Sequence, residues 1–439
     1  MKFALINPHW SFKGSIYFGC REPHLPIEYG YAKTLLEKKK HEVLIIDCHR
    51  ENLSVMELRN KVITFNPDYI VITTAPTYLY WRCTPPELTA PIETIEAIKD
   101  LDCIKVIVGP HGSVTPVTTL RKLGADIVII GECEEIIPLL NDKNRNKWKD
   151  IHSICYKDRD QIFVTGGPHA SNMSLLPPII WSKATLDQYR HQHHRFDSNE
   201  SSSGAELEGS RGCPYNCLFC AKDNFRNRYR KRPLTIVLKE LDNLINNGIE
   251  YIYFIDEIFL PDKELLSALI ERNIKFGMQT RIDLWNRQTI DLLNRAGCIS
   301  MEAGIESISE KGQLMINKQY IISTEQATEY LIYAKKRIPF VQATLIDSRL
   351  DSQEAIENWR QYLQHFGVWA NKPYPLFPYP GSAEYAKMWG DPDMQAWERA
   401  QEYYHNTYTE FNDLQEEHFL HLSEREVRSI HEQRMRITN

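Results

Sequence analysis

The stretch Arg211-Gly212-Cys213-Pro214-Tyr215-Asn216-Cys217-Leu218-Phe219-Cys220 carries the most specific chemical signal in this chain and predicts the fold around it. Its three cysteines have the spacing C-x3-C-x2-C. Three thiolates this close together can bind three irons of a four-iron, four-sulfur (4Fe–4S) cluster. The fourth iron then has no protein ligand within the motif, and an open metal position is what catalysis requires, whereas a structural site is closed.

A structural zinc site is the alternative for the same cysteines. Zinc takes a fourth Cys or His ligand, and the nearest histidines, His193 and His194, lie well upstream of the motif. The pattern therefore favours the iron–sulfur cluster over zinc.

Length and composition limit the classes of protein to which this chain can belong. A chain of 439 residues predicts two or three domains, and a hydrophobic fraction of 42% is that of a globular protein. The net charge of -6 gives no indication of a nucleic-acid partner. No window of apolar residues is long enough to cross a membrane, and the first apolar run is too short for a signal peptide. Scattered single cysteines are typical of the reducing cytoplasm, where we expect the protein.

Over residues 1–150, short β-branched runs alternate with helical patterns. Strands are expected at 3–6, 43–46, 69–73, 106–108 and 127–130, with helices at 29–40, 55–65, 91–99 and 116–123. This alternation predicts a doubly wound, flavodoxin- or Rossmann-like α/β domain, whose ligands bind at the carboxyl ends of the strands. The loops at those ends carry small or hydrogen-bonding residues, the pattern of a cradle for a large polar cofactor: His9, Thr73, Thr74, Pro76, Thr77, Gly109, Pro110, His111, Gly131 and Glu132.

A hairpin and linker are expected over 151–205, and a second alternating series over 206–385. Its strands are predicted at 207–210, 251–255, 276–280, 300–304, 340–345 and 372–377, and its helices at 236–246, 263–272, 289–296, 325–336 and 353–365. Repeated strand–helix units predict a partial β/α barrel with its active site at the carboxyl ends of the strands, where the cysteine motif follows the first strand. Residues 386–439 are expected to form a small helical region.

With these elements in place, the chain resembles the cobalamin-binding-domain radical S-adenosylmethionine (SAM) enzymes of the methyltransferase-like class B. The cysteine motif is the specific match. Weaker matches follow in the family's order, at 253–257, 280–283, 296–298, 304–307 and 378–382. In the first domain, 109–111 and 131–134 resemble the turns that contact cobalamin.

The resemblance implies a set of site residues. Cys213, Cys217 and Cys220 would bind the cluster, whose open iron would hold SAM, and cobalamin would lie on the loop residues of the first domain given above. Contacts to SAM are implied for Phe219, Asp256, Glu257, Arg281 and Glu306. The chain departs from the family pattern at 346–351 and lacks a D-x-H-x-x-G motif, so His9 is one candidate cobalt ligand and a cobalt without a protein histidine is the other.

Several of these residues have plainer interpretations. Arg281 and Asp283 share a face of a strand and are equally suited to an internal ion pair. Asp256 and Glu257 are adjacent, so on an extended strand they point to opposite faces. The basic run 226–232 fits either a solvated face or a docking site for an anionic substrate or an acidic electron donor.

The function that the resemblance implies is methyl transfer to an unactivated carbon through a 5′-deoxyadenosyl radical and methylcobalamin. One alternative keeps both cofactors but performs a rearrangement, ring contraction or oxidative cyclisation, and another is a non-catalytic cobalamin or redox sensor. We expect a small-molecule substrate, such as a sugar or natural-product intermediate, and an electron donor such as flavodoxin or ferredoxin, with neither nucleic acid nor membrane as a partner.

Overall fold

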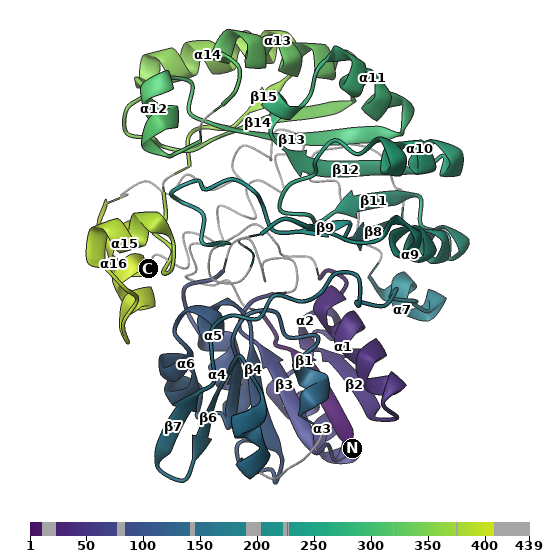
Figure 1. The fold of residues 1–439 in the computed structure, drawn as a ribbon, viewed down its shortest axis with the longest axis vertical. Helices are drawn as coiled ribbons and strands as arrows, with labels where there is room; N and C mark the ends of the chain where they lie inside the picture. The colour runs from purple at the N-terminus through teal and green to yellow at the C-terminus, as the bar shows by residue number, and fades with distance from the viewer. Residues whose placement is uncertain are drawn as a thin grey trace. The chain divides into compact units, whose positions relative to one another are not determined.

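The computed structural model describes residues 1–10, 23–76, 84–140, 145–189, 203–222, 226, 228–318, 320–374 and 376–407. The chain divides into two compact units, which are described separately (Figure 1). The first comprises 1–181, 221–227 and 379–401, and the second takes the remainder. None of the described helices is both long enough and apolar enough to cross a membrane.

The first unit is built on a seven-stranded sheet of order β2-β1-β3-β4-β5-β6-β7. Its first five strands are parallel: β1 (Lys2–Asn7), β2 (Glu42–Asp47), β3 (Tyr69–Thr73), β4 (Ile104–Val108) and β5 (Ile127–Ile129). The predicted hairpin forms β6 (Ile154–Asp158) and β7 (Gln161–Val164), which extend the same sheet in antiparallel fashion.

Helices cover both faces of this sheet because alternate strand residues point to opposite sides. Phe3 and Leu5 of β1 pack with α1 (Ile27–Lys38), whereas Ala4 and Ile6 pack in a second cluster. That second cluster includes residues of α3 (Val55–Phe65), α4 (Thr89–Ile98) and α6 (Pro116–Leu123). The doubly wound prediction is confirmed, with the short helices α2 (Cys48–Glu51) and α5 (Pro110–Val114) at the carboxyl edge.

The segment from α15 (Ala383–Trp389) into α16 (Ala396–Thr407) also belongs to the first unit, as far as Gln401. Trp397 is its anchor. The indole Nε1 donates to Thr115 Oγ1 at 3.2 Å, and the ring centroid lies 4.1 Å from that of His111. A stretch far away in the sequence thus packs on the start of α6.

The second unit contains a six-stranded, wholly parallel sheet of order β15-β14-β13-β12-β11-β8. The strands are β8 (Gly204–Leu207), β11 (Tyr251–Phe254), β12 (Lys275–Thr280), β13 (Cys298–Glu306), β14 (Phe340–Leu345) and β15 (Trp369–Ala370). Each strand pairs with the next in sequence, and no pairing joins the described β15 to β8, so the sheet is an open, partial β/α barrel.

Helices alternate with these strands: α9 (Leu234–Asn246), α10 (Lys263–Arg272), α11 (Arg287–Arg295), α12 (Glu310–Met315), α13 (Thr324–Lys335) and α14 (Gln353–His365). The short α7 (Lys183–Gln188) precedes β8. Two-residue strands β9 (Ser210–Arg211) and β10 (Arg230–Lys231) pair with each other on either side of the cysteine motif.

Two strand predictions were misplaced. The first strand ends at Leu207, before Gly209, and not at Ser210. The last strand is Trp369–Ala370 rather than 372–377, because the Asn371 side chain takes over the pairing. Asn371 accepts from Leu345 N at 2.7 Å and donates to Leu345 O at 2.9 Å. Pro373 has no N–H to donate. Within the predicted range, backbone pairing resumes at Tyr374, which donates to Leu345 O at 3.0 Å and accepts from Asp347 N at 2.8 Å in an isolated bridge.

Candidate active site

The cysteine loop is held by backbone contacts on both sides of its middle cysteine. Leu218 N donates to Ile316 O at 3.0 Å, and Asn317 Nδ2 donates to Asn216 O at 2.5 Å. A further bond from Cys220 N to Cys217 O, at 3.1 Å, closes the turn between the last two cysteines. The segment after α12 therefore fixes the backbone that carries Cys217.

The three cysteines are accessible and have the spacing of cluster ligands. Cys213, Cys217 and Cys220 are all half-buried, which leaves them within reach of a cofactor. Among the described residues, no group of three His, Cys, Asp or Glu side chains is gathered as around one metal ion. A cubane spreads its thiolates over separate irons, so one loop with three cysteines at this spacing fits a 4Fe–4S cluster.

Cations lie beside this loop. Burial raises the pKa of the Cys217 thiol, while the positive charges of Lys318 and Arg281 act in the opposite direction and Glu306 adds to the rise. An iron-bound thiolate is deprotonated, so Lys318 and Arg281 favour the form of Cys217 that binds a cluster.

Arg281 forms the internal ion pair considered as its plainer interpretation. Its Nε and Nη2 donate to the two carboxylate oxygens of Asp283 at 3.0 and 2.8 Å. The guanidinium carbon also lies 3.9 Å from the ring centroid of Tyr215 and 4.8 Å from that of Tyr320. Arg281 therefore stacks directly on a residue of the cysteine motif.

Glu306 ends β13 in an unusual conformation. Its φ is +67°, in the left-handed region that non-glycine residues rarely adopt, at a register shift between β13 and β14. Its Oε1 accepts from Lys318 Nζ at 2.9 Å, and both side chains are buried. Backbone strain of this kind clusters at functional sites.

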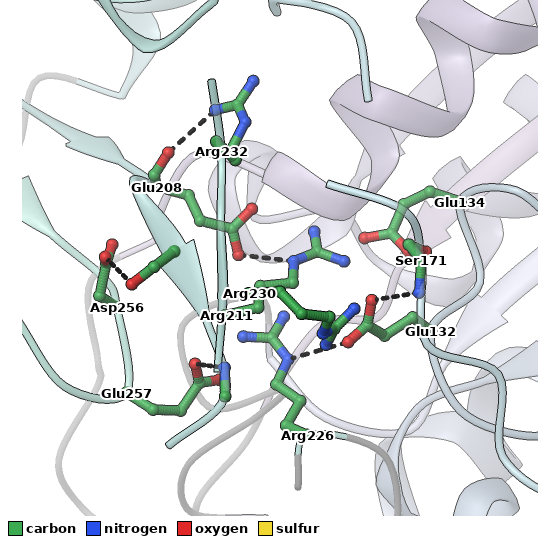
Figure 2. A network of polar contacts seen from close by, with 12 residues as sticks. Glu132, Glu134, Ser171, Glu208, Arg211, Arg226, Arg230, Arg232, Asp256 and Glu257 are labelled. Atoms are coloured by element: carbon green, nitrogen blue, oxygen red, sulfur yellow. Dashed lines mark hydrogen bonds and ion pairs between the residues drawn. The ribbon is translucent and has the colours of Figure 1, made fainter. Parts of the chain in front are cut away.

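Asp256 and Glu257 do not occupy opposite faces of a strand, because β11 ends at Phe254 and both lie in the following loop. Asp256 accepts from Gly209 N at 2.8 Å and from Ser210 Oγ, and Glu257 accepts from Gly212 N at 2.7 Å (Figure 2). Both carboxylates hold the backbone that leads into the cysteine loop. Burial is the main cause that raises the pKa of Asp256 to about 7.

The basic run is not the uniformly solvated face that its charges suggest. Arg232 is buried and forms a bidentate pair with Glu240 at 2.7 and 2.9 Å. Its Nη1 also donates to Glu208 O at 2.9 Å (Figure 2). Arg226 is also buried, in the first unit, with its Nε 3.9 Å from Glu132 Oε1. Arg228 is exposed, so only part of the run remains available to a partner.

In the first unit, the predicted loop residues that the structure describes gather at the carboxyl edge of the sheet. Thr74 N donates to Val108 O at 2.9 Å, which joins the loops after β3 and β4. Gly109 has φ +117°, and a Cβ there would lie 2.6 Å from Thr74 Oγ1. The buried Thr74 hydroxyl has no hydrogen-bond partner among the described residues. Pro76 and Pro110 are buried beside these loops, and Thr77 lies outside the described residues.

The other loop residues are more strongly tied into the unit. His111 is fully buried, its Nε2 donates to Pro86 O at 3.3 Å, and burial lowers its pKa to about 3, so it is neutral. Glu132 accepts from Ser171 N at 2.8 Å (Figure 2). A Cβ on Gly131 would lie 2.4 Å from the His169 backbone.

Three further predicted residues complete the comparison. His9 is exposed, and its Nδ1 lies 3.2 Å from Leu53 O. Thr73 is buried and donates to Ala75 O at 2.8 Å. Phe219 is half-buried within the cysteine loop. The histidines His193 and His194, weighed as zinc ligands, lie outside the described residues.

Comparison with known proteins agrees with this geometry. Residues 207–358 match the family described as the Radical SAM superfamily. This chain contains a radical SAM domain. It is a radical SAM enzyme, and the match begins at the end of β8 and includes the cysteine loop and the strands through β14.

Relatives extend the likeness beyond that domain. The chain is 25% identical over 403 residues to an uncharacterized methyltransferase of Pyrococcus horikoshii, covering 88% of this chain and 83% of the relative. It is 21% identical to the anaerobic magnesium-protoporphyrin IX monomethyl ester cyclase of Cereibacter sphaeroides, covering 86% of this chain but only 63% of the cyclase.

A solved structure shares the fold of both units. The radical SAM methyltransferase TsrM from Kitasatospora setae, with tryptophan and a SAM analogue bound, superposes with a TM-score of 0.69 at 17% identity, over 88% of this chain and 76% of that one. The likeness establishes a shared architecture, and what each residue does in this chain depends on its own contacts.

Sequence reasoning missed Lys318, Tyr215, Tyr320 and Trp397. Tyr215 stands within the cysteine motif, so its position was a usable signal. Lys318 and Tyr320 follow the unpredicted helix α12, and no motif marks them.

Proposed function

We propose that this chain is a cobalamin-dependent radical SAM methyltransferase that acts on an unactivated carbon of a small molecule. The observation that carries the proposal is the three-cysteine loop after the first strand of an open parallel barrel, in a chain that also contains a doubly wound unit. Proteins of this architecture include TsrM, whose solved structures hold cobalamin and a 4Fe–4S cluster. The Pyrococcus relative is also named as a methyltransferase.

In this proposal, Cys213, Cys217 and Cys220 bind the cluster as thiolates. When bound there, the cluster would supply the electron for reductive cleavage of SAM. Phe219, half-buried in the same loop, offers its ring to the SAM adenine. Glu306 offers the SAM ribose its second carboxylate oxygen, since Oε1 is bound to Lys318.

In this proposal, Asp256, Glu257 and Arg281 contribute to SAM binding by fixing the backbone and side chains around the cysteine loop. The two carboxylates accept from the backbone of Gly209 and Gly212, so they set where the backbone between β8 and Cys213 presents its groups. Arg281 is bound to Asp283 and stacks on the cysteine motif. Orientation of this kind is the main contribution that a protein makes to radical chemistry.

Cobalamin would lie on the carboxyl edge of the first sheet. Gly109 and Gly131 let the loops at this edge pack closely, because a Cβ would meet Thr74 Oγ1 at the first and the His169 backbone at the second. The buried Thr74 hydroxyl has hydrogen-bonding capacity that a polar cofactor can satisfy. His9, exposed after β1, is the candidate protein ligand to cobalt.

The experiment begins with the protein isolated without oxygen from cobalamin-fed cells. About four irons and one cobalt per chain would support both cofactor sites, and iron without cobalt would refute the cobalamin site. With reductant and substrate candidates, methyl transfer predicts S-adenosylhomocysteine in addition to 5′-deoxyadenosine. A Cys217→Ala variant is the matched control and is expected to lose iron.

A second candidate, oxidative cyclisation without methyl transfer, is favoured by the cyclase of Cereibacter sphaeroides, which matches 86% of this chain. It predicts 5′-deoxyadenosine with no S-adenosylhomocysteine. Either reaction needs a low-potential electron donor such as flavodoxin or ferredoxin, whose acidic surface would suit the exposed Arg228.

A further inference from the structure

The ion pair of Lys318 and Glu306 lies next to the segment that holds the cysteine loop, although no sequence motif marks Lys318. The three residues Ile316, Asn317 and Lys318 run beside Asn216–Leu218. The two hydrogen bonds between these segments, from Leu218 N to Ile316 O and from Asn317 Nδ2 to Asn216 O, lie on either side of Cys217. Lys318 therefore directly follows the two residues, Ile316 and Asn317, that hold the backbone on either side of Cys217.

Lys318 does not reach into solvent. Only 5% of the residue is exposed, and its Nζ is paired at 2.9 Å with Glu306, which is 7% exposed. Salt screens charges at an exposed surface but has much less effect on buried ones. Salt therefore screens little of the effect that either charge has on its surroundings, and removing one member leaves the charge of the other uncompensated.

Arg281 fixes where this pair lies. Its Nη1 donates to Lys318 O at 2.9 Å, while Nε and Nη2 are bound to Asp283. Its planar group lies over both the Tyr215 ring of the cysteine motif and the Tyr320 ring beyond Lys318. The guanidinium thus stacks on the cysteine loop, donates to the backbone of Lys318 and pairs with Asp283. A lysine cannot reproduce this combination of contacts.

We propose that Lys318 and Glu306 set the reduction potential of the cluster in opposite directions, and that Arg281 is the positioning residue that holds Lys318 in place. The inference rests on the proposed function only in that a 4Fe–4S cluster binds the loop. One electron from a low-potential donor reduces the cluster, which becomes one charge more negative while no bond forms or breaks. A nearby cation favours that gain and a nearby anion opposes it, because net charge and local contacts set cluster potentials.

The test is a redox titration of the cluster, followed by electron paramagnetic resonance on anaerobic protein without SAM, at alkaline pH. The variant Lys318→Gln is expected to lower the reduced-to-oxidised ratio at a fixed potential about tenfold, a shift of about 59 mV to more negative potential. Glu306→Gln is expected to shift it in the opposite direction. The double variant is expected to lie between the two, and Lys318→Arg close to wild type.

Two controls separate a charge effect from a structural one. Lys336→Gln removes an exposed lysine at the far end of α13, close to where β14 begins, and is expected to leave the potential unchanged. Arg281→Lys keeps the charge but loses the stacking and the fork of hydrogen bonds, so it is expected to shift the potential in the same direction as Lys318→Gln.

The inference is overturned if both single variants shift the potential in the same direction, or if neither shifts it while iron content stays full. Equal losses of thermal stability with an unchanged potential would show that the pair is only structural, which also overturns it. Absence of iron in the wild-type protein would instead refute the proposed function, so the two failures are distinguishable.

Discussion

Replacing Asp256 with asparagine is expected to stabilise the second unit at alkaline pH and to have little effect at acidic pH. Burial raises the pKa of Asp256 to about 7 in the folded chain, whereas an unfolded aspartate has a pKa of about 3.9. The folded state therefore holds the proton more tightly. Stability is greatest below the unfolded pKa and falls as pH rises through the folded pKa of about 7.

The size of the effect follows from the gap between the two pKa values. They differ by about three pH units, and each unit corresponds to about 1.4 kcal/mol. Ionised Asp256 should then cost on the order of 4 kcal/mol, as an upper bound. The nearby carboxylates of Glu208 and Glu257 act in the same direction as burial, while the bonds from Gly209 N and Ser210 Oγ oppose it.

Asparagine fits the same space with its hydrogen bonds satisfied. Its Oδ1 can accept from Gly209 N, and its Nδ2 can donate to Ser210 Oγ, where the carboxylate now accepts. The substitution removes the charge, keeps both of these hydrogen bonds and creates no cavity. The difference between wild type and variant therefore reports mainly the charge.

The assay compares unfolding of Asp256→Asn and wild type from pH 5 to pH 9, with hydrogen exchange at Gly209 and Ser210 as the local measure. Because a chain with two units does not unfold in one step, the exchange data decide. Asp291→Asn is the contrasting control: a hydrogen bond from Arg337 lowers the pKa of Asp291, so its stabilisation is lost as pH falls. If Asp256→Asn were less stable than wild type at every pH, the reasoning would be refuted.

Three further substitutions test the packing around the two sites. Glu240→Leu removes the carboxylate that pairs with the buried Arg232 guanidinium and is expected to cost about 3–5 kcal/mol in urea unfolding. If the double variant with Arg232→Met recovers nothing, the ion pair is not the cause. Gly131→Ala is expected to cost at least about 1–3 kcal/mol, because the strain at φ +91° is joined by a Cβ contact 2.4 Å from the His169 backbone, and an unchanged melting temperature would contradict this. Trp397→Ala removes the indole over His111 and is expected to cost about 3–5 kcal/mol and to raise the pKa of His111 from about 3 toward its usual value, measured by proton NMR; a histidine that still fails to titrate would show that other groups bury it.

Much of the fold could be predicted because the start of a helix depends on residues that lie next to it in the sequence. Val55–Phe65, Lys263–Arg272 and Gln353–His365 were predicted to the residue. Each follows a side chain that caps its first turn: Ser54, Asp262 and Ser352 accept from backbone N–H groups two or three residues on. Ser323 caps α13 (Thr324–Lys335) in the same way, by accepting from Gln326 N at 3.2 Å, and the helix expected at 325–336 begins and ends one residue earlier than expected.

The charged contacts could not be predicted, because their partners are distant or change character on folding. The run 226–232 looks solvated in sequence, and nothing local indicates that Arg232 pairs with Glu240 inside α9. Similarly, nothing in the sequence near Lys318 indicates that it pairs with Glu306, which lies at the end of β13. Propensity and periodicity locate elements, whereas burial of a charge is decided by long-range packing.

The same limit explains why motif resemblance suggested three carboxylates for SAM contact but could not distinguish their roles. Asp256 and Glu257 match a motif for SAM contact, yet each accepts from backbone N–H groups at the entrance to the cysteine loop. Glu306 matches another, and it is bound to a cation through one oxygen only. A carboxylate that accepts from backbone N–H groups positions that backbone. A carboxylate that uses one oxygen to pair with a cation can accept from a ligand hydroxyl through its other oxygen. Of the three, Glu306 is therefore the one whose replacement should weaken SAM binding directly.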